Sequence, residues 1–376
     1  MVGAVFITAI VITVFVYSYF SALCGLALRR GLTHKREEIL PTVTLIVCAY
    51  NEEAVILKKI ENILQIDYPQ ERMNVWFVND HSTDRTREII AENIHQIPFA
   101  KKAFDNEFAR GKTNALNYVF PKLESEVAIE TDADSFLDPK SVRELVKNFA
   151  DDNIGGANGV VKILSLEKGG QAAQHEGFYR TLYDFWRRGE SAIDSISICN
   201  GPIMAFRTEL VRDVQLRSMA DDTELLFEII RKNRRVVYDQ NAIAYECTPA
   251  NFNERIRQKM RRVKGVFQVY FRNLDLIGVG RFGRHIFPFV FLQICVIPYL
   301  VILGLSSFLI LASLNPLLWL TFILMVIPKI NTLLWNIIST QLIMALSPLH
   351  YKGGAWRTIR SSRQMLSDID IETFKE

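Results

Sequence analysis

The sequence lacks an excess of charge of either sign. Its 376 residues include 44 lysines and arginines against 41 aspartates and glutamates, a formal net charge of +3. Nucleic-acid-binding proteins attract phosphates with an excess of basic residues, so this near balance argues against a nucleic-acid partner. The five cysteines lie far apart without a C-x-x-C pair, which argues against a disulfide framework and against a zinc site.

Charged residues are missing from the whole stretch Val2–Leu28, and Arg29 and Arg30 follow it directly. About 20 apolar residues are enough to span a bilayer. The stretch begins with apolar residues, without the basic segment that opens a signal peptide, and it is too long for the apolar part of one. We therefore predict a transmembrane helix over residues 1–30.

Two more apolar stretches come near the end of the chain. Within residues 286–348 we predict two spans, the first over 286–314 and the second over 315–348. The second is kinked or strongly tilted near Pro328, with two short helices as the alternative. Basic residues flank the predicted spans on one side, and such flanks face the cytoplasm. We expect a multi-pass protein of the cell membrane, with a cytoplasmic domain over 31–250, an amphipathic interfacial region over 251–285 and a basic cytoplasmic tail over 349–376.

Between the first two spans, short β-rich runs alternate with helical patterns. Apolar runs over residues 42–50, 73–80 and 126–134 are typical of buried strands, and helical patterns over 52–65 and 83–96 separate them. This alternation predicts an α/β fold with a mostly parallel central sheet. In open α/β sheets, ligands bind beyond the carboxyl ends of the strands.

Polar side chains follow each of these predicted strands: Tyr50-Asn51-Glu52, Asn79-Asp80 and Asp132-Ala133-Asp134. Two aspartates one residue apart repel each other, so they need either water or a cation. Aspartate is also common in ordinary turns. Because three such ends would line one crevice, we favour a nucleotide site where Asp134 holds a divalent cation that neutralises a diphosphate.

Several segments resemble, in family order, the membrane-bound members of glycosyltransferase family 2. The segments lie between Pro41 and Val263 and read VCAYNEE, VNDHSTDRT, RGKTNALN, TDADS, NGPIMAFR, ADDTEL and QKMRRV. The resemblance implies the type A glycosyltransferase fold together with transmembrane helices. It also implies a nucleoside-diphosphate sugar as donor, with a UDP-sugar favoured.

The same resemblance implies a role for each matching residue. Tyr50 and Glu52 would bind the base, and Asp80 the base or the ribose. Lys112 would lie near the nucleotide or its phosphates, and Asp132 would contact the ribose near the metal. Asp134, with Asp132, would hold Mg²⁺ or Mn²⁺. Asp222 would accept the proton of the acceptor hydroxyl, and Gln258 and Arg261 would stabilise the leaving diphosphate.

Arg262 departs from the family pattern, because many polymerising members have tryptophan there to support the acceptor sugar. An arginine at this ligand-binding position suits a phosphate instead. We therefore favour a membrane lipid or lipid-linked acceptor; that the transfer is inverting is implied by the resemblance and by the single base aspartate. The alternatives are a processive polysaccharide synthase of the hyaluronan, chitin or poly-N-acetylglucosamine type, and a non-catalytic membrane scaffold. Whether the protein forms a homo-oligomer stays open.

Overall fold

A computed structural model describes residues 1–31, 33–164, 171–247, 252–319 and 328–350, together with Arg363 and Leu366. The chain forms two compact units. We call residues 32–167, 194–255 and 353–376 the sheet unit, and residues 1–31, 168–193 and 256–352 the helical unit. The continuous domain predicted over 31–250 is thus interrupted, because residues 168–193 group with the apolar helices.

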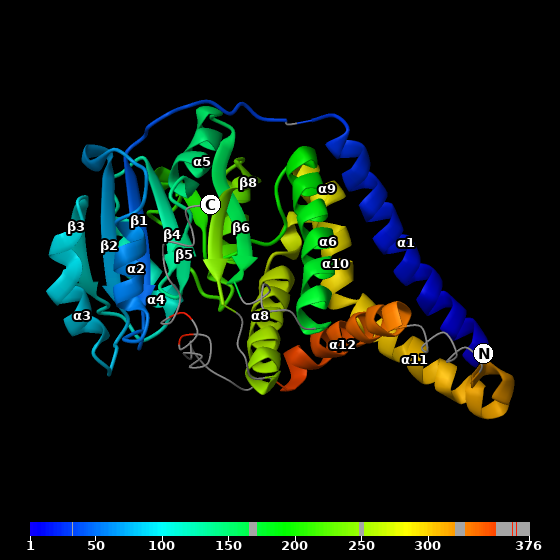
Figure 1. The fold of residues 1–376 in the computed structure, drawn as a ribbon. Helices are drawn as coiled ribbons and strands as arrows, with labels where there is room; N and C mark the ends of the chain where they lie inside the picture. Colours follow the sequence, from blue (N-terminus) through cyan, green and yellow to red (C-terminus); the bar gives the residue numbers. More distant parts are fainter. Residues whose placement is uncertain are drawn as a thin grey trace. The chain divides into compact units, whose positions relative to one another are not determined.

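The sheet unit is built on a sheet whose eight described strands have the order β3-β2-β1-β4-β7-β6-β8-β5 (Figure 1). The pairs β1–β2, β1–β4, β2–β3 and β6–β8 are parallel, whereas β4–β7, β6–β7 and β5–β8 are antiparallel. The predicted α/β class is confirmed, but the sheet is mixed, because β7 runs against both of its neighbours. The strands are β1 (Val43–Ala49), β2 (Met73–Asn79), β3 (Ala100–Asp105), β4 (Val127–Asp132), β5 (Ser135–Leu137), β6 (Ile154–Ile163), β7 (Met204–Arg207) and β8 (Arg235–Glu246).

The predicted alternation in the first half is present as β1, α2 (Ile56–Ile63), β2, α3 (Thr86–Asn93) and β4. Two further elements, β3 and helix α4 (Lys112–Val119), come between α3 and β4 and were not predicted from the sequence. β3 ends the described sheet, and most of its side chains are exposed. An exposed edge strand needs no run of apolar residues, so it leaves little trace in the sequence.

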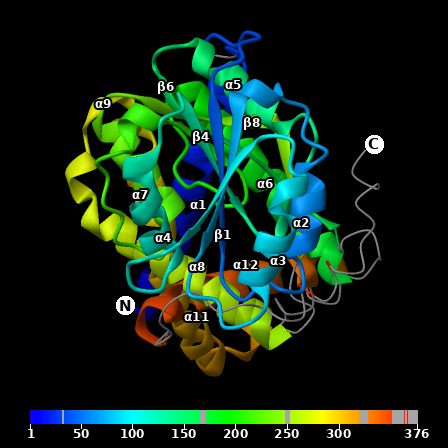
Figure 2. The ribbon, with the colours of Figure 1, turned by 90° about the vertical axis from the view of Figure 1, so that its left-hand side faces the viewer.

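Helices cover both faces of the sheet around β1. Leu45 and Val47 share an apolar cluster with Ile56 and Ile60 of α2. Ile46 lies between them and is equally buried, and it points to the other face because strand residues alternate. On that face α4 contacts β1 and β2, and α7 (Asp221–Arg231) contacts β6 and β8. Figure 2 shows α4 and α7 on one side of the sheet and α2 on the other.

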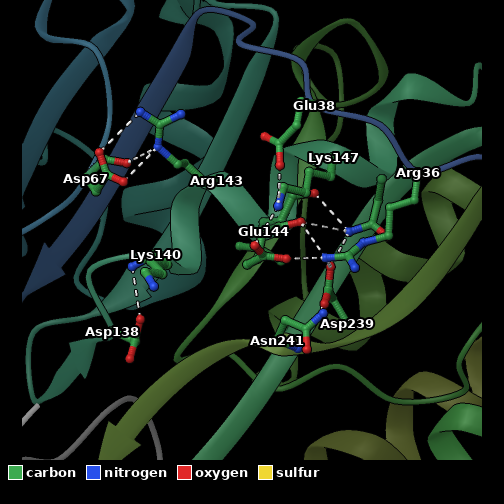
Figure 3. A network of polar contacts seen from close by, with 12 residues as sticks. Arg36, Glu38, Asp67, Asp138, Lys140, Arg143, Glu144, Lys147, Asp239 and Asn241 are labelled. Carbon is green, nitrogen blue, oxygen red and sulfur yellow. Dashed lines mark hydrogen bonds and ion pairs between the residues drawn. The ribbon is translucent and has the colours of Figure 1, made fainter. Parts of the chain in front are cut away.

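A polar network fixes the segment before β1 to helix α5 (Ser141–Lys147) and to β8 (Figure 3). Arg36 Nη2 lies 2.6 Å from Glu144 Oε2 and 2.8 Å from Asp239 Oδ2. Lys147 Nζ lies 2.6 Å from Glu38 Oε1 and 2.7 Å from Glu144 Oε1. Asp239 is almost completely buried, so the guanidinium supplies the counter-charge that a buried carboxylate requires. The network fixes the direction in which the chain enters β1.

In the helical unit, α1 (Val2–Leu28) packs against α6 (Gln171–Ile193) and α11 (Ile297–Leu314). A Cβ atom added at Gly189 would lie 2.2 Å from Cys24 Cβ, so the close approach of α6 to α1 requires glycine there. Trp186 Nε1 also donates to Ser21 Oγ at 3.0 Å. The other helices are α8 (Phe252–Arg272), which belongs to this unit from Ile256 onward, α9 (Gly280–His285), α10 (Phe287–Cys295) and α12 (Pro328–His350).

Two described helices, Val2–Leu28 and Ile297–Leu314, are long and apolar enough to cross a membrane, judged by length and composition alone. The span predicted over 286–314 is divided into α10 and α11, which meet at Val296. Pro298 has no N–H to donate to the preceding turn, which explains the break. Residues 320–327 of the second predicted span, and residues 351–376 of the predicted tail apart from Arg363 and Leu366, lie outside the described residues.

Candidate active site

The polar residues predicted at the strand ends lie along one edge of the sheet. β1 pairs in parallel with both β2 and β4, so the carboxyl ends of the three strands are neighbours. Tyr50 and Glu52 follow β1, Asp80 follows β2, and Asp132 ends β4 just before Asp134. The structure therefore brings together the groups that the sequence places at separate strand ends.

Lys112, the first residue of α4, lies among three carboxylates. Its Nζ is 2.5 Å from Asp132 Oδ1, 2.7 Å from Glu130 Oε1 and 3.9 Å from Asp221 Oδ2. Glu130 is fully buried on β4; burial raises its pKa, and the lysine ammonium opposes that shift. The sequence analysis missed Glu130, although the period of two places it on the same face of β4 as Asp132.

Asp222 lies near Lys112 and Asp132, on the side of Gly201 where a Cβ atom would be. A Cβ atom at Gly201 would lie 3.2 Å from Lys112 Nζ and 3.7 Å from Oδ2 of both Asp132 and Asp222. These three groups therefore surround one point, which glycine leaves open. Asn158 holds the loop in place, because its Nδ2 donates to Asn200 O at 2.9 Å and its Oδ1 accepts from Asn200 N at 3.0 Å.

Asp222 lies in the first turn of α7, where its Oδ1 accepts from the N–H of Thr223 at 2.7 Å. Burial, and then the charge of Asp221, raise the pKa of Asp222 above the usual range of an aspartate. A carboxylate whose pKa is shifted toward neutrality is a better proton acceptor than an ordinary surface aspartate. The role of Asp222 as the catalytic base stays a prediction.

Asp80 is fully buried, and its partners belong to the loop that leads into α4. Its carboxylate accepts from Gly111 N at 2.8 Å and from Asn106 Nδ2 at 2.7 Å. These bonds place Lys112, which directly follows Gly111. The predicted contact of Asp80 with the base or ribose stays a prediction, while its contacts in the structure support a role in loop positioning.

Tyr50 is half-buried and pairs with Arg110, a residue to which the sequence analysis gave no role. Arg110 Nη1 donates to Tyr50 Oη at 2.7 Å, and its guanidinium carbon lies 4.9 Å from the centre of the Tyr50 ring. The pair places an aromatic face and a positive charge beside the end of β1.

Glu52 and Asp134 share a partner from the other end of the sequence. Arg363 donates to both carboxylate oxygens of Glu52, and its Nη2 lies 3.3 Å from Asp134 Oδ2. Glu52 is fully buried and Arg363 is only 6% exposed. Burial raises the pKa of Glu52, and its bonds to Arg363 counteract that shift. Arg363 lies in the segment predicted as a basic cytoplasmic tail, and no role in the site was predicted for it.

The carboxylates of Asp132 and Asp134 thus have different partners, Lys112 and Arg363. Among the described residues, no group of three or more His, Cys, Asp or Glu side chains is arranged to hold a metal ion. Mg²⁺ is commonly held by one or two carboxylates, with phosphates and water as its other ligands, and Mn²⁺ favours the same oxygen ligands. The carboxylate oxygens of Asp132 and Asp134 are ligands of the kind that such a cation takes, and their joint role as metal ligands stays a prediction.

Gln258, Arg261 and Arg262 lie on α8 in the helical unit. Gln258 and Arg261 are half-buried, whereas Arg262 is exposed. Their spacing of three and four residues puts them on one face of the helix. Their contacts with a donor or acceptor stay predictions.

A family model described as glycosyltransferase like family 2 matches residues 41–265, more than half of the chain. The beta-monoglucosyldiacylglycerol synthase of Nostoc sp. is 30% identical over 266 residues, 67% of this chain and 55% of that protein. The probable glycosyltransferase YdaM of Bacillus subtilis is 26% identical over 246 residues, 63% and 58% of the two chains. A poly-beta-1,6-N-acetyl-D-glucosamine synthase of Staphylococcus epidermidis is 23% identical over 274 residues, 69% and 65%. The chain spans between about half and two thirds of the length of these relatives.

Among solved structures, the mannosyltransferase PcManGT from Pyrobaculum calidifontis, in complex with GDP-Man and Mn²⁺, matches with a TM-score of 0.78. The match covers 94% of this chain and 100% of that one, with 21% sequence identity. At this level of identity the likeness establishes the fold alone, which is that of the type A glycosyltransferases.

Proposed function

Because the chain belongs to glycosyltransferase family 2, we propose that it transfers a sugar from a nucleoside-diphosphate sugar to a lipid or lipid-linked acceptor. A UDP-sugar is the first donor to test. The observation that carries this proposal is the arrangement of Lys112, Asp132 and Asp222 around Gly201. A positive charge, a strand-end carboxylate and the proposed proton acceptor thus lie around one point.

The proposed reaction is a single displacement. The acceptor hydroxyl oxygen attacks C1 of the donor sugar, the bond between C1 and the diphosphate oxygen breaks, and the hydroxyl proton passes to Asp222. Attack from the face opposite the leaving group inverts the configuration at C1. The raised pKa of Asp222 suits proton acceptance, and the ammonium of Lys112 supplies positive charge beside the departing diphosphate.

Asp134, with Asp132, is proposed to hold Mg²⁺ or Mn²⁺, which when bound neutralises the diphosphate charge. Gln258 and Arg261 are proposed to bind the leaving diphosphate, because a guanidinium forms paired, charge-assisted hydrogen bonds with phosphate oxygens. Their place on one face of α8 is consistent with such a joint contact.

Three observations support a membrane lipid as the acceptor. Two described helices have the length and composition of membrane spans, a relative is named as a glucosyldiacylglycerol synthase, and Arg262 replaces the tryptophan of many polymerising members. The basic flanks support a multi-pass protein of the cell membrane with the sheet unit in the cytoplasm. The similarity to a poly-N-acetylglucosamine synthase keeps polysaccharide synthesis as the second candidate.

The test uses the purified full chain in lipid nanodiscs that contain diacylglycerol and a polyprenyl phosphate. Radiolabelled UDP-glucose, UDP-N-acetylglucosamine and GDP-mannose are supplied in turn with Mn²⁺, and the products are extracted into organic solvent. We expect label from one donor in the organic phase, about 100-fold less or lower still with Asp222→Asn, and none with EDTA. Label in a product of high molecular mass would favour the polysaccharide synthase instead. No transfer from any donor would contradict the proposal.

A further inference from the structure

Lys59 of α2 is a completely buried lysine to which the proposed mechanism gives no role. Its Nζ donates to Thr131 Oγ1 at 2.9 Å and to the backbone oxygen of Ser135 at 2.6 Å. Thr131 and Ser135 directly flank the turn Asp132-Ala133-Asp134. The ammonium group therefore joins the two ends of the turn that carries the proposed metal ligands.

The flanking residues add two further bonds to this arrangement. Ser135 Oγ donates to Asp132 O at 3.0 Å and lies 3.2 Å from Thr131 Oγ1. Thr131 and Ser135 are both fully buried. Asp134 thus belongs to a turn whose two flanking residues, Thr131 and Ser135, are both hydrogen-bonded to Lys59.

A buried ammonium is costly unless its charge is compensated. Within the described part of the chain, no acidic side chain is in direct contact with Lys59. Burial lowers the pKa of Lys59 to about 7, while the charges of Asp132 and Asp134 act to raise it. The compensating charges are therefore those of the turn itself.

Asn62, one helical turn further along α2, offers a comparison. It is also fully buried, and it bonds the same strand, β5. Its Nδ2 donates to Leu137 O at 2.8 Å, and its Oδ1 accepts from Leu137 N at 2.8 Å. A neutral amide is thus sufficient to join α2 to β5. Of these two side chains, the charged donor is the one that bonds both ends of the turn with the two aspartates.

We propose that Lys59 is a positioning residue that fixes the turn so that the Asp134 carboxylate is directed toward a divalent cation bound with the donor diphosphate. This inference rests on the proposed function, because it takes Asp134 as the metal ligand. Residues that hold metal ligands in place typically change metal affinity or activity by about 10-fold to 100-fold when they are replaced.

The test compares Lys59→Met with the matched control Asn62→Leu in the purified full chain. Methionine keeps an unbranched apolar side chain of similar length but removes the donor and its charge. The measured quantity is the Kd for Mn²⁺ in the presence of UDP, from the loss of the electron paramagnetic resonance signal of free Mn²⁺. We expect the Kd of Lys59→Met to rise at least about tenfold, while Asn62→Leu keeps the native Kd and lowers the melting temperature.

A second variant covers the case where Lys59→Met fails to fold. Thr131→Val keeps the side-chain shape and removes one of the two acceptors of Lys59, so its Kd should lie between the native value and the tenfold change. A native Kd in Lys59→Met, or a tighter one, overturns the role of Lys59 and leaves the proposed function intact. An equal loss of Mn²⁺ affinity in Asn62→Leu overturns it too. If the native chain binds no Mn²⁺ with UDP, both this inference and the metal assignment fail.

Discussion

The ion pair between Arg363 and Glu52 allows a quantitative test of whether the end of the chain is part of the site. Arg363→Gln leaves a fully buried carboxylate without its counter-charge. Removing one partner of a buried ion pair typically costs about 3–5 kcal/mol. In a unit of this size each kcal/mol corresponds to about 2–4 °C in melting temperature. We therefore expect Arg363→Gln to melt at least about 6 °C below the native chain.

Glu52→Gln and the double variant complete a thermodynamic cycle. The double variant has neither charge, so its loss should be smaller than the sum of the single losses by about 1–3 kcal/mol. Thermal unfolding in detergent, followed by tryptophan fluorescence, measures the loss of stability of the two single variants and of the double variant relative to the native chain. Arg143→Gln is the control, because Arg143 pairs with Asp67 in the same unit through partly exposed side chains; exposed pairs contribute less than about 1 kcal/mol.

The cycle also predicts a dependence on pH. Burial favours the neutral form of Glu52 and raises its pKa, and in Arg363→Gln the opposing guanidinium is absent. A carboxyl whose pKa is higher in the folded than in the unfolded chain loses folding stability as pH rises above the unfolded value. With Arg363 in place the pKa of Glu52 is about 8, and without the guanidinium it is higher, so the deficit of Arg363→Gln should grow as pH rises above about 8 and be larger at pH 9 than at pH 6. Additive single losses, within about 0.5 kcal/mol, or a deficit independent of pH would refute the assigned ion pair.

Other predictions concern the proposed chemistry. Asp134→Asn should abolish transfer and Mn²⁺-dependent UDP binding without changing the circular dichroism spectrum; activity undiminished in EDTA would contradict the metal assignment. Asp222→Asn should keep the native UDP affinity but lower turnover by about 100-fold or more, and because the pKa of Asp222 is raised, native turnover should rise with pH above the usual range of an aspartate. Arg261→Ala should weaken both UDP binding and turnover, so a profile identical to that of Asp222→Asn would refute the division of roles. Arg262→Trp should not increase the lipid product, as measured by extraction into organic solvent.

The parts of the fold that the sequence predicts are those where one physical requirement dominates. β1, β2 and β4 are buried on both faces near the centre of the sheet, so they consist of almost continuous apolar runs. Once these strands are predicted, Tyr50, Glu52 and Asp132 are expected at the edge of the sheet where the strands end. β3 is missed because an exposed edge strand has no such requirement, and the direction of β7 cannot be deduced from a short apolar run.

Some missed residues do have a local signal. Lys59 lies three residues after Ile56 and four before Ile63, so helical spacing places it on the apolar face of α2. A lysine on an apolar face is a buried charge that needs an explanation. Glu130 likewise shares a face of β4 with Asp132, and alternation in the strand is enough to identify it.

Arg363 has no comparable signal, because its place is set by the tertiary fold. It is separated from Glu52 by 311 positions, and in the sequence it is one of several basic residues after the last apolar stretch. The family resemblance assigns Glu52 to the base of the donor, yet both of its carboxylate oxygens are bonded to Arg363. Glu52 has no exposed surface while that pair is intact. A direct contact between Glu52 and the base therefore requires at least one bond of the pair to break, a condition that follows from the fold and not from the motif.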